Sequence, residues 1–208
     1  MKINKPLFIV FEGIDGSGKT TLSEMLYKFF LDNGISSVKD QEPTDGQWGK
    51  KIRNLLKNEA ANANELLELF IKDREDDVAN TILPSMQSGK IIIMDRYYFS
   101  NAAYQGAMGI SPDFIIEKNR EKKFPEPDRV YLIDIDPETA LKRITNRNNG
   151  IKTEIFEKKY FLKKVRDIYY SITDHKFIIL NGADTLKKNL KIIKTDINKN
   201  FFNNEIKH

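Results

Sequence analysis

The sequence predicts an α/β protein in which helices wrap a five-stranded parallel sheet. Five short apolar runs, each typical of a buried strand, occupy residues 7–11, 35–38, 91–94, 130–135 and 177–180. Segments with helical periodicity separate these runs, and strands that alternate with helices form parallel sheets. Because no proline- or glycine-rich linker interrupts the 208 residues, a single domain is expected.

Helices in the first half of the chain are predicted from spacing and from their end signals. Apolar side chains over residues 22–30 recur every three or four positions, and Gly34 supplies a stop for that helix. A short helix is expected around Ile52. A long helix is expected over residues 64–83, closed by Pro84, because proline cannot continue a helix without disturbing it.

The second half of the sequence predicts several further helices, with one polar interruption between two of them. Residues 97–122 are helical in two pieces, with a break near residues 106–112. Asp136 and Pro137 are typical of a helix cap followed by proline in the first turn. Polar residues then break the helical pattern, so a mobile lid is expected at about residues 146–155. Further helices are expected over residues 157–173 and 186–197, followed by a polar tail from about residue 199.

Composition excludes several classes of protein. The chain has no cysteine, which excludes disulfides and thiolate metal sites, and two histidines argue against a multi-histidine metal centre. No apolar run approaches the ~18 residues that cross a bilayer, so no membrane partner is expected. The net charge of +4 comes from scattered lysines, which a solvated surface explains, so no nucleic-acid partner is expected either. A reducing, cytoplasmic location is predicted.

The strongest motif is a phosphate-binding loop at residues 13–20, which match G-x-x-x-x-G-K-[ST] between a strand and an amphipathic helix. Its glycines let backbone N–H groups turn inward around phosphate oxygens, and the helix N-terminus adds its positive end. Lys19 is a point charge for the β- and γ-phosphates, and the Thr20 hydroxyl can ligate Mg²⁺. The expected ATP-binding residues are Gly13, Asp15, Gly16, Ser17, Gly18, Lys19, Thr20 and Thr21.

A second group of polar residues follows the strand at residues 91–94. Asp95 can hold a water of Mg²⁺ or the acceptor substrate, and Arg96 can bind a phosphate with two parallel hydrogen bonds. Taken alone, this pair is as compatible with a structural salt bridge. Asn101 and Gln105 follow within two helical turns, and their amides can read the edge of a base.

Two residues of the long helix also point to a base. Phe70 and Arg74 are four positions apart and therefore share one helix face. Phenylalanine offers a stacking plane and arginine a fork of donors. For an isolated pair, a core phenylalanine beside a surface arginine is the commoner alternative. Tyr104, taken alone, is equally compatible with filling the core and with a place in the binding site.

In combination, these motifs resemble the thymidylate kinase (dTMP kinase) family of P-loop nucleoside monophosphate kinases. The resemblance runs from residue 7 to about residue 180. It implies the P-loop kinase fold, phosphoryl transfer from ATP to dTMP with Mg²⁺, giving dTDP and ADP, and a homodimer. The matching elements are residues 11–21, Glu42-Pro43, Phe70 with Asp73-Arg74, Asp95-Arg96-Tyr97, residues 100–105 and residues 131–134 with Pro137-Glu138.

The resemblance also implies a role for each matching position. Asp15 would bind the 3′-hydroxyl of dTMP, and Arg53 would join Arg96 on its phosphate. Phe70 would stack on thymine, whose edge Arg74 and an amide would read, and Tyr104 would crowd the sugar 2′ position. The implied metal residues are Thr20 and Asp95, and the implied dTMP-binding residues are Asp15, Pro43, Arg53, Phe70, Arg74, Arg96, Asn101, Tyr104 and Gln105.

Two departures from the family pattern stand out. Many relatives have two glycines after the Glu-Pro pair, whereas this chain has Thr44-Asp45-Gly46. Family members also place a catalytic arginine in the phosphate loop or in the lid, and this loop has none. Arg147 is therefore expected to complete a catalytic group with Lys19, Asp95 and Arg96, because its planar fork matches phosphate oxygens better than an ammonium does. Lys152 and Arg143 are the alternatives.

Two other functions compete with this interpretation. A deoxynucleoside kinase has a similar fold, but its acceptor is an uncharged hydroxyl that gains nothing from Arg53 and Arg96. A non-catalytic nucleotide-binding module would tolerate the loss of Lys19. The intact set of Lys19, Thr20 and Asp95 disfavours that module.

Overall fold

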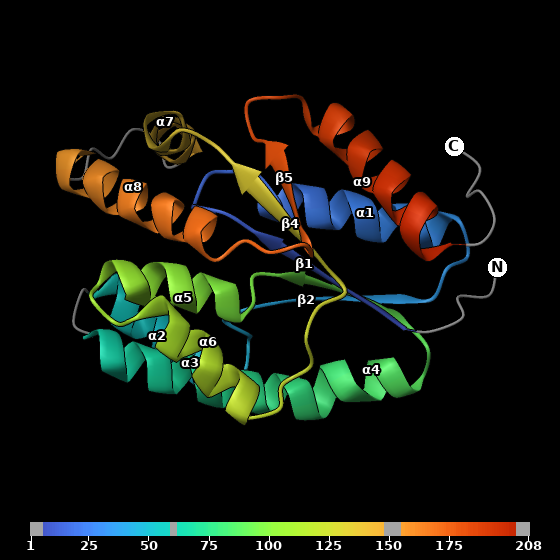
Figure 1. Ribbon diagram of the computed structural model, residues 1–208, viewed down its shortest axis with the longest axis horizontal. Coiled ribbons are helices and arrows are strands. Elements are labelled where there is room, and N and C mark those ends of the chain that lie inside the picture. Colours follow the sequence, from blue (N-terminus) through green and yellow to red (C-terminus); the bar gives the residue numbers. More distant parts are fainter. Residues whose placement is uncertain (1–5, 59–61, 148–154, 203–208) are drawn as a thin grey trace.

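The computed structural model describes residues 6–58, 62–147 and 155–202, without the side chains of Arg147 and of residues 155–157. One five-stranded, all-parallel sheet forms its centre, in the strand order β2-β3-β1-β4-β5. This sheet confirms the predicted α/β fold class (Figure 1). The strands are β1 (Leu7–Glu12), β2 (Ser37–Gln41), β3 (Ile91–Asp95), β4 (Arg129–Asp134) and β5 (Phe177–Asn181).

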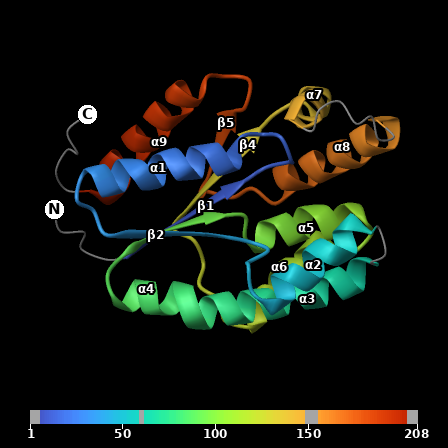
Figure 2. The ribbon, with the colours of Figure 1, turned by 180° about the vertical axis from the view of Figure 1, so that it is seen from behind.

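Helices cover both faces of the sheet, as Figures 1 and 2 show from opposite sides. Helices α1 and α9 lie on one face, and the helices from α2 to α6 together with α8 lie on the other. The described helices are α1 (Lys19–Asp32), α2 (Gln47–Lys57), α3 (Ala63–Asp77), α4 (Leu83–Gln87), α5 (Tyr98–Ala107), α6 (Pro112–Glu121), α7 (Pro137–Arg147), α8 (Ile155–Ser171) and α9 (Leu186–Phe201), with the π-helical turn η1 (Val78–Ile82) between α3 and α4.

The central strand β1 separates two hydrophobic cores, because successive side chains of a strand point to opposite faces. Phe8 and Val10 pack with residues of α3, α5 and α8. Leu7, Ile9 and Phe11 pack with residues of α1 and α9. All six residues of β1 are buried, which is why the strand appears in the sequence as a continuous apolar run rather than an alternating one.

Strand β2 begins two residues later than predicted. Ile35 instead follows the end of α1, where its N–H donates to the carbonyl of Phe30 and its side chain is buried in the same core cluster. The strand itself continues through Lys39 and Asp40 to Gln41 at the edge of the sheet. An edge strand has water on one side, so its polar residues concealed where it ends.

The prediction that Pro84 closes the long helix is wrong. The helical backbone continues from α3 through η1 into α4, and Pro84 lies in the first turn of α4. Proline lacks an N–H and crowds the carbonyl four residues before it, which a wider turn tolerates. The π-helical turn directly before Leu83 provides that width, and the helix passes the proline without ending.

Of two other predicted helix ends, one agrees with the structure and one does not. Asp136 Oδ2 accepts hydrogen bonds from the backbone N–H groups of Glu138 and Thr139, at 2.9 and 3.1 Å, so it caps α7 as expected. At the C-terminus, α9 continues to Phe201, and Phe202 is buried in stacking contact with Phe30. The tail expected from about residue 199 is therefore part of the fold as far as residue 202.

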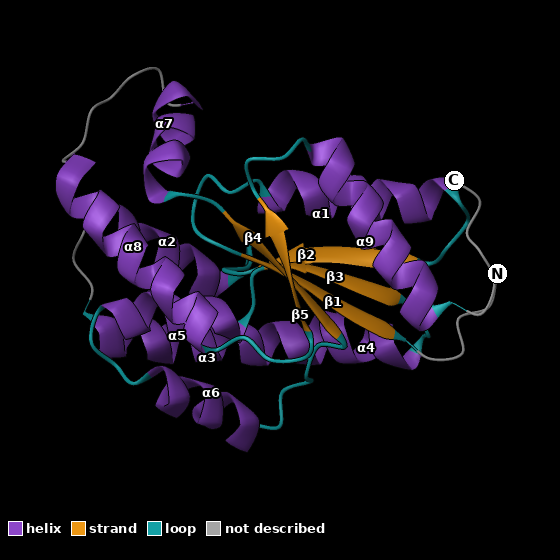
Figure 3. Cartoon of the chain, turned by 45° about the horizontal axis from the view of Figure 1, so that its top comes forward, coloured by secondary structure: helices purple, strands orange, loops and turns teal. Residues whose placement is uncertain are grey.

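Figure 3 shows the strands, in orange, fanning out between the helical layers. Parallel strands place all their carboxyl ends at one edge, where ligands bind in sheets of this kind. The expected lid falls largely outside the described residues, between the end of α7 at Arg147 and the start of α8 at Ile155. Within the described residues, no helix combines the length and the apolar character that a membrane span requires.

Candidate active site

A cavity of about 1010 Å³ opens at the carboxyl edge of the sheet. Its floor is the loop between β1 and α1, and its walls come from α2, α3, α5, α7 and the loop before α9. The sequence-predicted residues that line it are Asp15, Gly16, Ser17, Gly18, Lys19, Thr20, Thr21, Pro43, Arg53, Phe70, Asp95, Arg96, Asn101, Tyr104 and Gln105. Gly13 lies just beneath this lining, where its carbonyl accepts a hydrogen bond from Arg96.

The phosphate loop has the backbone that its glycines predict. Gly13 and Gly16 have φ values of 140° and 81°, in the left-handed region that favours glycine. A Cβ atom at Gly13 would lie 2.5 Å from the carbonyl oxygen of Ile133, and one at Gly16 would lie 2.6 Å from that of Ala140. The loop can therefore fold this tightly only with glycine at both positions.

Lys19 is buried at the centre of this loop, where its Nζ donates to the carbonyl of Ile14 at 3.0 Å. Burial, reinforced by the positive charge of Arg96, lowers the pKa of Lys19 to about 8. The buried ammonium has lost most of its hydration, and the oxygens of a phosphate chain bound at this loop would replace it.

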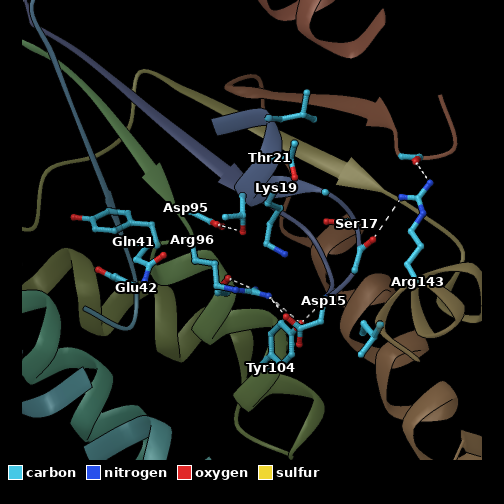
Figure 4. A pocket seen from close by; sticks show the side chains of 18 of the residues that line it. Asp15, Ser17, Lys19, Thr21, Gln41, Glu42, Asp95, Arg96, Tyr104 and Arg143 are labelled. Carbon is cyan, nitrogen blue, oxygen red and sulfur yellow. Dashed lines mark hydrogen bonds and ion pairs between the residues drawn. The ribbon is translucent and has the colours of Figure 1, made fainter. Parts of the chain in front are cut away.

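Thr20 and Asp95 lie together, as the predicted metal pair requires. The hydroxyl of Thr20 donates to Asp95 Oδ2 at 2.5 Å, and both residues line the cavity. Figure 4 shows Asp95 close to Lys19. Hydroxyl and carboxylate oxygens are ligands that Mg²⁺ accepts, usually one or two from the protein with water and phosphate oxygens completing the shell. This pair therefore fits a Mg²⁺ ion that is also bound by phosphate oxygens and water.

Arg96 occupies a strained position directly after β3. Its φ of 75° is unusual for a residue other than glycine, and such strain concentrates at functional sites. The guanidinium donates to Asp15 Oδ1 at 2.5 Å and to Ser100 Oγ at 2.9 Å. Figure 4 shows Arg96 and Asp15 pointing toward each other across the cavity floor. Burial alone would raise the pKa of Asp15, but Arg96 and Lys19 outweigh it and lower that pKa.

Tyr104 joins this pair rather than simply filling the core. Its hydroxyl accepts from the backbone N–H of Asp15 and donates to Asp15 Oδ2, both at 3.1 Å. The Arg96 guanidinium lies over its ring, 5.1 Å from the ring centroid. The ring lines the cavity between the two side chains that the resemblance assigns to the acceptor's 3′-hydroxyl and phosphate.

Glu12, for which the sequence suggested no role, is linked to Arg96 through the hydroxyl of Ser100. It is fully buried and accepts hydrogen bonds from the N–H groups of Tyr97 and Ser100 and from the hydroxyls of Ser100 and Tyr169. Burial raises its pKa although Arg96 is near. Ser100 thus connects this carboxyl group to the Arg96 guanidinium. A charged residue at the end of an apolar strand was the one signal that could have revealed it.

Arg74 does not face the cavity, contrary to the role expected for it. Its side chain is 0% exposed, and its guanidinium pairs with the carboxylate of Glu42. The same guanidinium donates to Asn119 Oδ1 at 2.6 Å and to Asn101 Oδ1 at 2.7 Å. Arg74 therefore positions Asn101, because it fixes which end of that amide is the acceptor and leaves the Nδ2 group as the donor.

The amides that line the acceptor end form one ordered set. Asn101 Nδ2 donates to Gln105 Oε1 at 3.2 Å, and Phe70 lines the same end of the cavity. Glu42, joined to Pro43 by a cis peptide bond, was not predicted to matter beyond its place in the motif. Its burial against Arg74 is a contact between residues 32 positions apart, which periodicity cannot reveal.

At the other end of the cavity, Arg143 is the lid-side arginine that the structure describes. It donates to the carbonyl of Gly182 at 3.0 Å and approaches that of Gly16 at 3.5 Å. The side chain of Arg147 and the whole of Lys152 lie outside the described residues. The loop after β5 and the first turn of α9 also line this end, through Gly182, Asp184 and Thr185 of the loop and Leu186 and Asn189 of the helix, none of which was predicted to line the site.

Comparison with known proteins agrees with this geometry. A family model described as thymidylate kinase matches residues 11–193. The thymidylate kinase of Leptospira borgpetersenii serovar Hardjo-bovis (strain L550) is 39% identical over 206 residues, which cover 97% of this chain and 100% of that protein. That of Leptospira interrogans serovar copenhageni (strain Fiocruz L1-130) is 40% identical, with 88% and 89% covered. The probable thymidylate kinase of Archaeoglobus fulgidus is also 40% identical, with 93% of each chain covered. The chain belongs to the thymidylate kinase family.

Proposed function

We propose that this protein transfers the γ-phosphoryl group of ATP to dTMP, giving ADP and dTDP. One observation carries the proposal: a single cavity has a phosphate loop at one end and two arginines, Arg53 and Arg96, beside Phe70 and Asn101 at the other. Its volume lies at the upper end of the range for ligand pockets, about 300–1,000 Å³.

The acceptor needs no general base. A phosphate monoester has its second pKa at about 6, so near pH 7 it is mostly a dianion and already nucleophilic. The protein's part is to position the two phosphates and to neutralise charge. Lys19 would hold the donor phosphates, and Arg53 and Arg96 the acceptor phosphate. Thr20 and Asp95 would hold Mg²⁺, which supplies positive charge at the donor phosphate oxygens.

The nucleoside parts of the two substrates would use the remaining walls. Phe70 would stack on thymine and Asn101 would donate to its edge, while Asp15 would bind the 3′-hydroxyl beside Tyr104. Arg147 stays our candidate for the cation that closes over the transferring phosphoryl group, with a lid over residues 146–155. A homodimer and a cytoplasmic location are also part of the proposal.

A coupled assay of ADP release tests this function. With Mg-ATP as donor, dTMP should give a higher kcat/KM than dUMP, CMP or thymidine. Phosphorylation of thymidine without phosphorylation of dTMP would instead identify a deoxynucleoside kinase. Lys19→Met is the matched negative control, since removal of one preorganised charge typically costs at least about a hundredfold in kcat.

A further inference from the structure

Arg53 forms an ion pair with a carboxylate of the protein itself, that of Asp45. Its NH1 group donates to the carbonyl of Pro43 at 2.9 Å, and its NH2 group pairs with Asp45 Oδ1 at 2.9 Å. Asp45 is the one charged partner that Arg53 has among the described residues. The pair is exposed, with 39% of the Arg53 side chain and 89% of the Asp45 side chain accessible.

The backbone that carries Asp45 is held firmly. The N–H and hydroxyl of Thr44 both donate to the carboxylate of Asp73, at 2.7 and 2.6 Å, and the Thr44 hydroxyl accepts from the N–H of Gly46 at 3.1 Å. A Cβ atom at Gly49 would lie 1.8 Å from the Thr44 carbonyl oxygen, so the first turns of α2 pack directly on this loop. Rotation of the Asp45 side chain alone is therefore enough to release Arg53.

We infer that Asp45 is a built-in competitor for the acceptor phosphate, and that dTMP must displace its carboxylate from Arg53 in order to bind. The inference rests on the proposed function, because it takes Arg53 as a ligand of that phosphate. A phosphate dianion offers more charge and a better match to the guanidinium fork than the single negative charge of a carboxylate. A nucleoside without a phosphate displaces nothing and gains nothing from Arg53.

Asp45 therefore acts as a specificity-determining counter-ion. Its ion pair with Arg53 must be broken before a phosphate can bind there, which raises the affinity that an acceptor phosphate needs.

Calorimetric titration with dTMP and with thymidine tests the inference on the Asp45→Asn variant. Loss of the competing carboxylate should tighten dTMP binding about two- to fivefold, the range that corresponds to an exposed ion pair. Thymidine binding should stay unchanged. Unchanged or weaker dTMP binding would overturn the inference, and so would an equal gain for both ligands.

Two further variants make the test specific. Asp32→Asn removes the same charge from another exposed pair, Lys28–Asp32, at the far end of α1, and should leave both affinities as they are. In an Arg53→Gln background, Asp45→Asn should no longer tighten dTMP, because the contested guanidinium is absent. If Asp45→Asn tightened dTMP binding as much in the Arg53→Gln protein as in the wild type, Asp45 would act without Arg53. If the wild-type protein phosphorylates dTMP but Asp45→Asn leaves dTMP affinity unchanged, the inference alone is refuted. If the wild-type protein does not bind dTMP, the proposed function is refuted as well.

Discussion

Tyr104 shows how one side chain can have two separable tasks. Its hydroxyl holds Asp15, while its ring lies in the cavity between Asp15 and Arg96. If the ring faces C2′ of the acceptor sugar, a ribose hydroxyl would clash with it or be buried without a partner, at a cost of about 1–3 kcal/mol. The ring would then select the sugar, and the hydroxyl would orient the aspartate.

Substitutions at Tyr104 separate these tasks. Tyr104→Ala should narrow the preference for dTMP over its ribonucleotide counterpart by about five- to a hundredfold, measured as the ratio of the two kcat/KM values. Tyr104→Phe keeps the ring, so the ratio should stay while kcat/KM for dTMP falls. An unchanged ratio in the alanine variant would leave the ring with a packing role only.

The lid arginines can be separated in the same way. Arg143 contacts the carbonyls of Gly16 and Gly182, so Arg143→Ala should mainly raise KM for ATP. Arg147→Ala should lower kcat at least about a hundredfold, at the low end of what an arginine finger contributes, with dTMP binding nearly intact. Lys152→Ala tests the third candidate. A loss below tenfold for Arg147→Ala, together with a large kcat loss for Arg143→Ala or Lys152→Ala, would assign the catalytic role to that other residue.

At the scale of an element, the continuous helix from α3 to α4 carries an unusual buried acid. Asp77 is 4% exposed at the junction with the π-helical turn, and neither of its carboxylate oxygens accepts a hydrogen bond of normal geometry, although Thr81 is near. Burial, together with the negative charges of Glu42, Asp40 and Asp73, raises the pKa of Asp77 to about 8. The folded protein therefore binds this proton more tightly than the unfolded chain does.

This acid predicts a pH-dependent stability. The folded-state pKa of Asp77 lies above the unfolded value of about 4. Its burial therefore does not lower the free energy of unfolding below pH 4, and lowers it increasingly as pH rises toward 8. Asp77→Asn should therefore raise the free energy of unfolding at pH 8 by about 1–3 kcal/mol and change it little at pH 4. Urea denaturation at both pH values measures this. The exposed neighbour provides the control, Asp76→Asn, and an equal effect of both variants would argue against burial as the cause.

At the scale of the whole molecule, ligands should stabilise the fold as a unit, because the cavity is lined from both halves of the chain. At a concentration one hundred times its dissociation constant, dTMP should stabilise the folded state by about 2.7 kcal/mol. For a chain of this size that corresponds to a rise in Tm of roughly 5–10 °C. Thermal scans with dTMP and with CMP at equal concentration measure the difference. Equal shifts for both nucleotides would contradict a site that reads thymine.

The sequence by itself determined the features that depend on local chemistry. The phosphate loop was identifiable because its glycines, Lys19 and Thr20 must stand at fixed spacing for backbone N–H groups to surround a phosphate. All five strands and most helices were identifiable because burial imposes a period on neighbouring residues. The exact bounds of the edge strand β2 and the passage of the helix through Pro84 were not, because sheet position and a widened turn decide them rather than local preference.

The tertiary structure alone decided how charges are paired. Glu12 meets Tyr169 across 157 positions of the chain, and Arg74 meets Glu42 across 32. Hydrophobic periodicity contains no information about contacts at such separations. The sequence therefore suggested that Arg74 reads the base, and did not indicate its buried ion pair with Glu42. The pairing of Arg53 with Asp45 is also set by folding, because the α2 turns that pack on Thr44 bring the two side chains together. Burial and charge compensation are properties of contacts between distant segments, and those contacts exist only once the chain has folded.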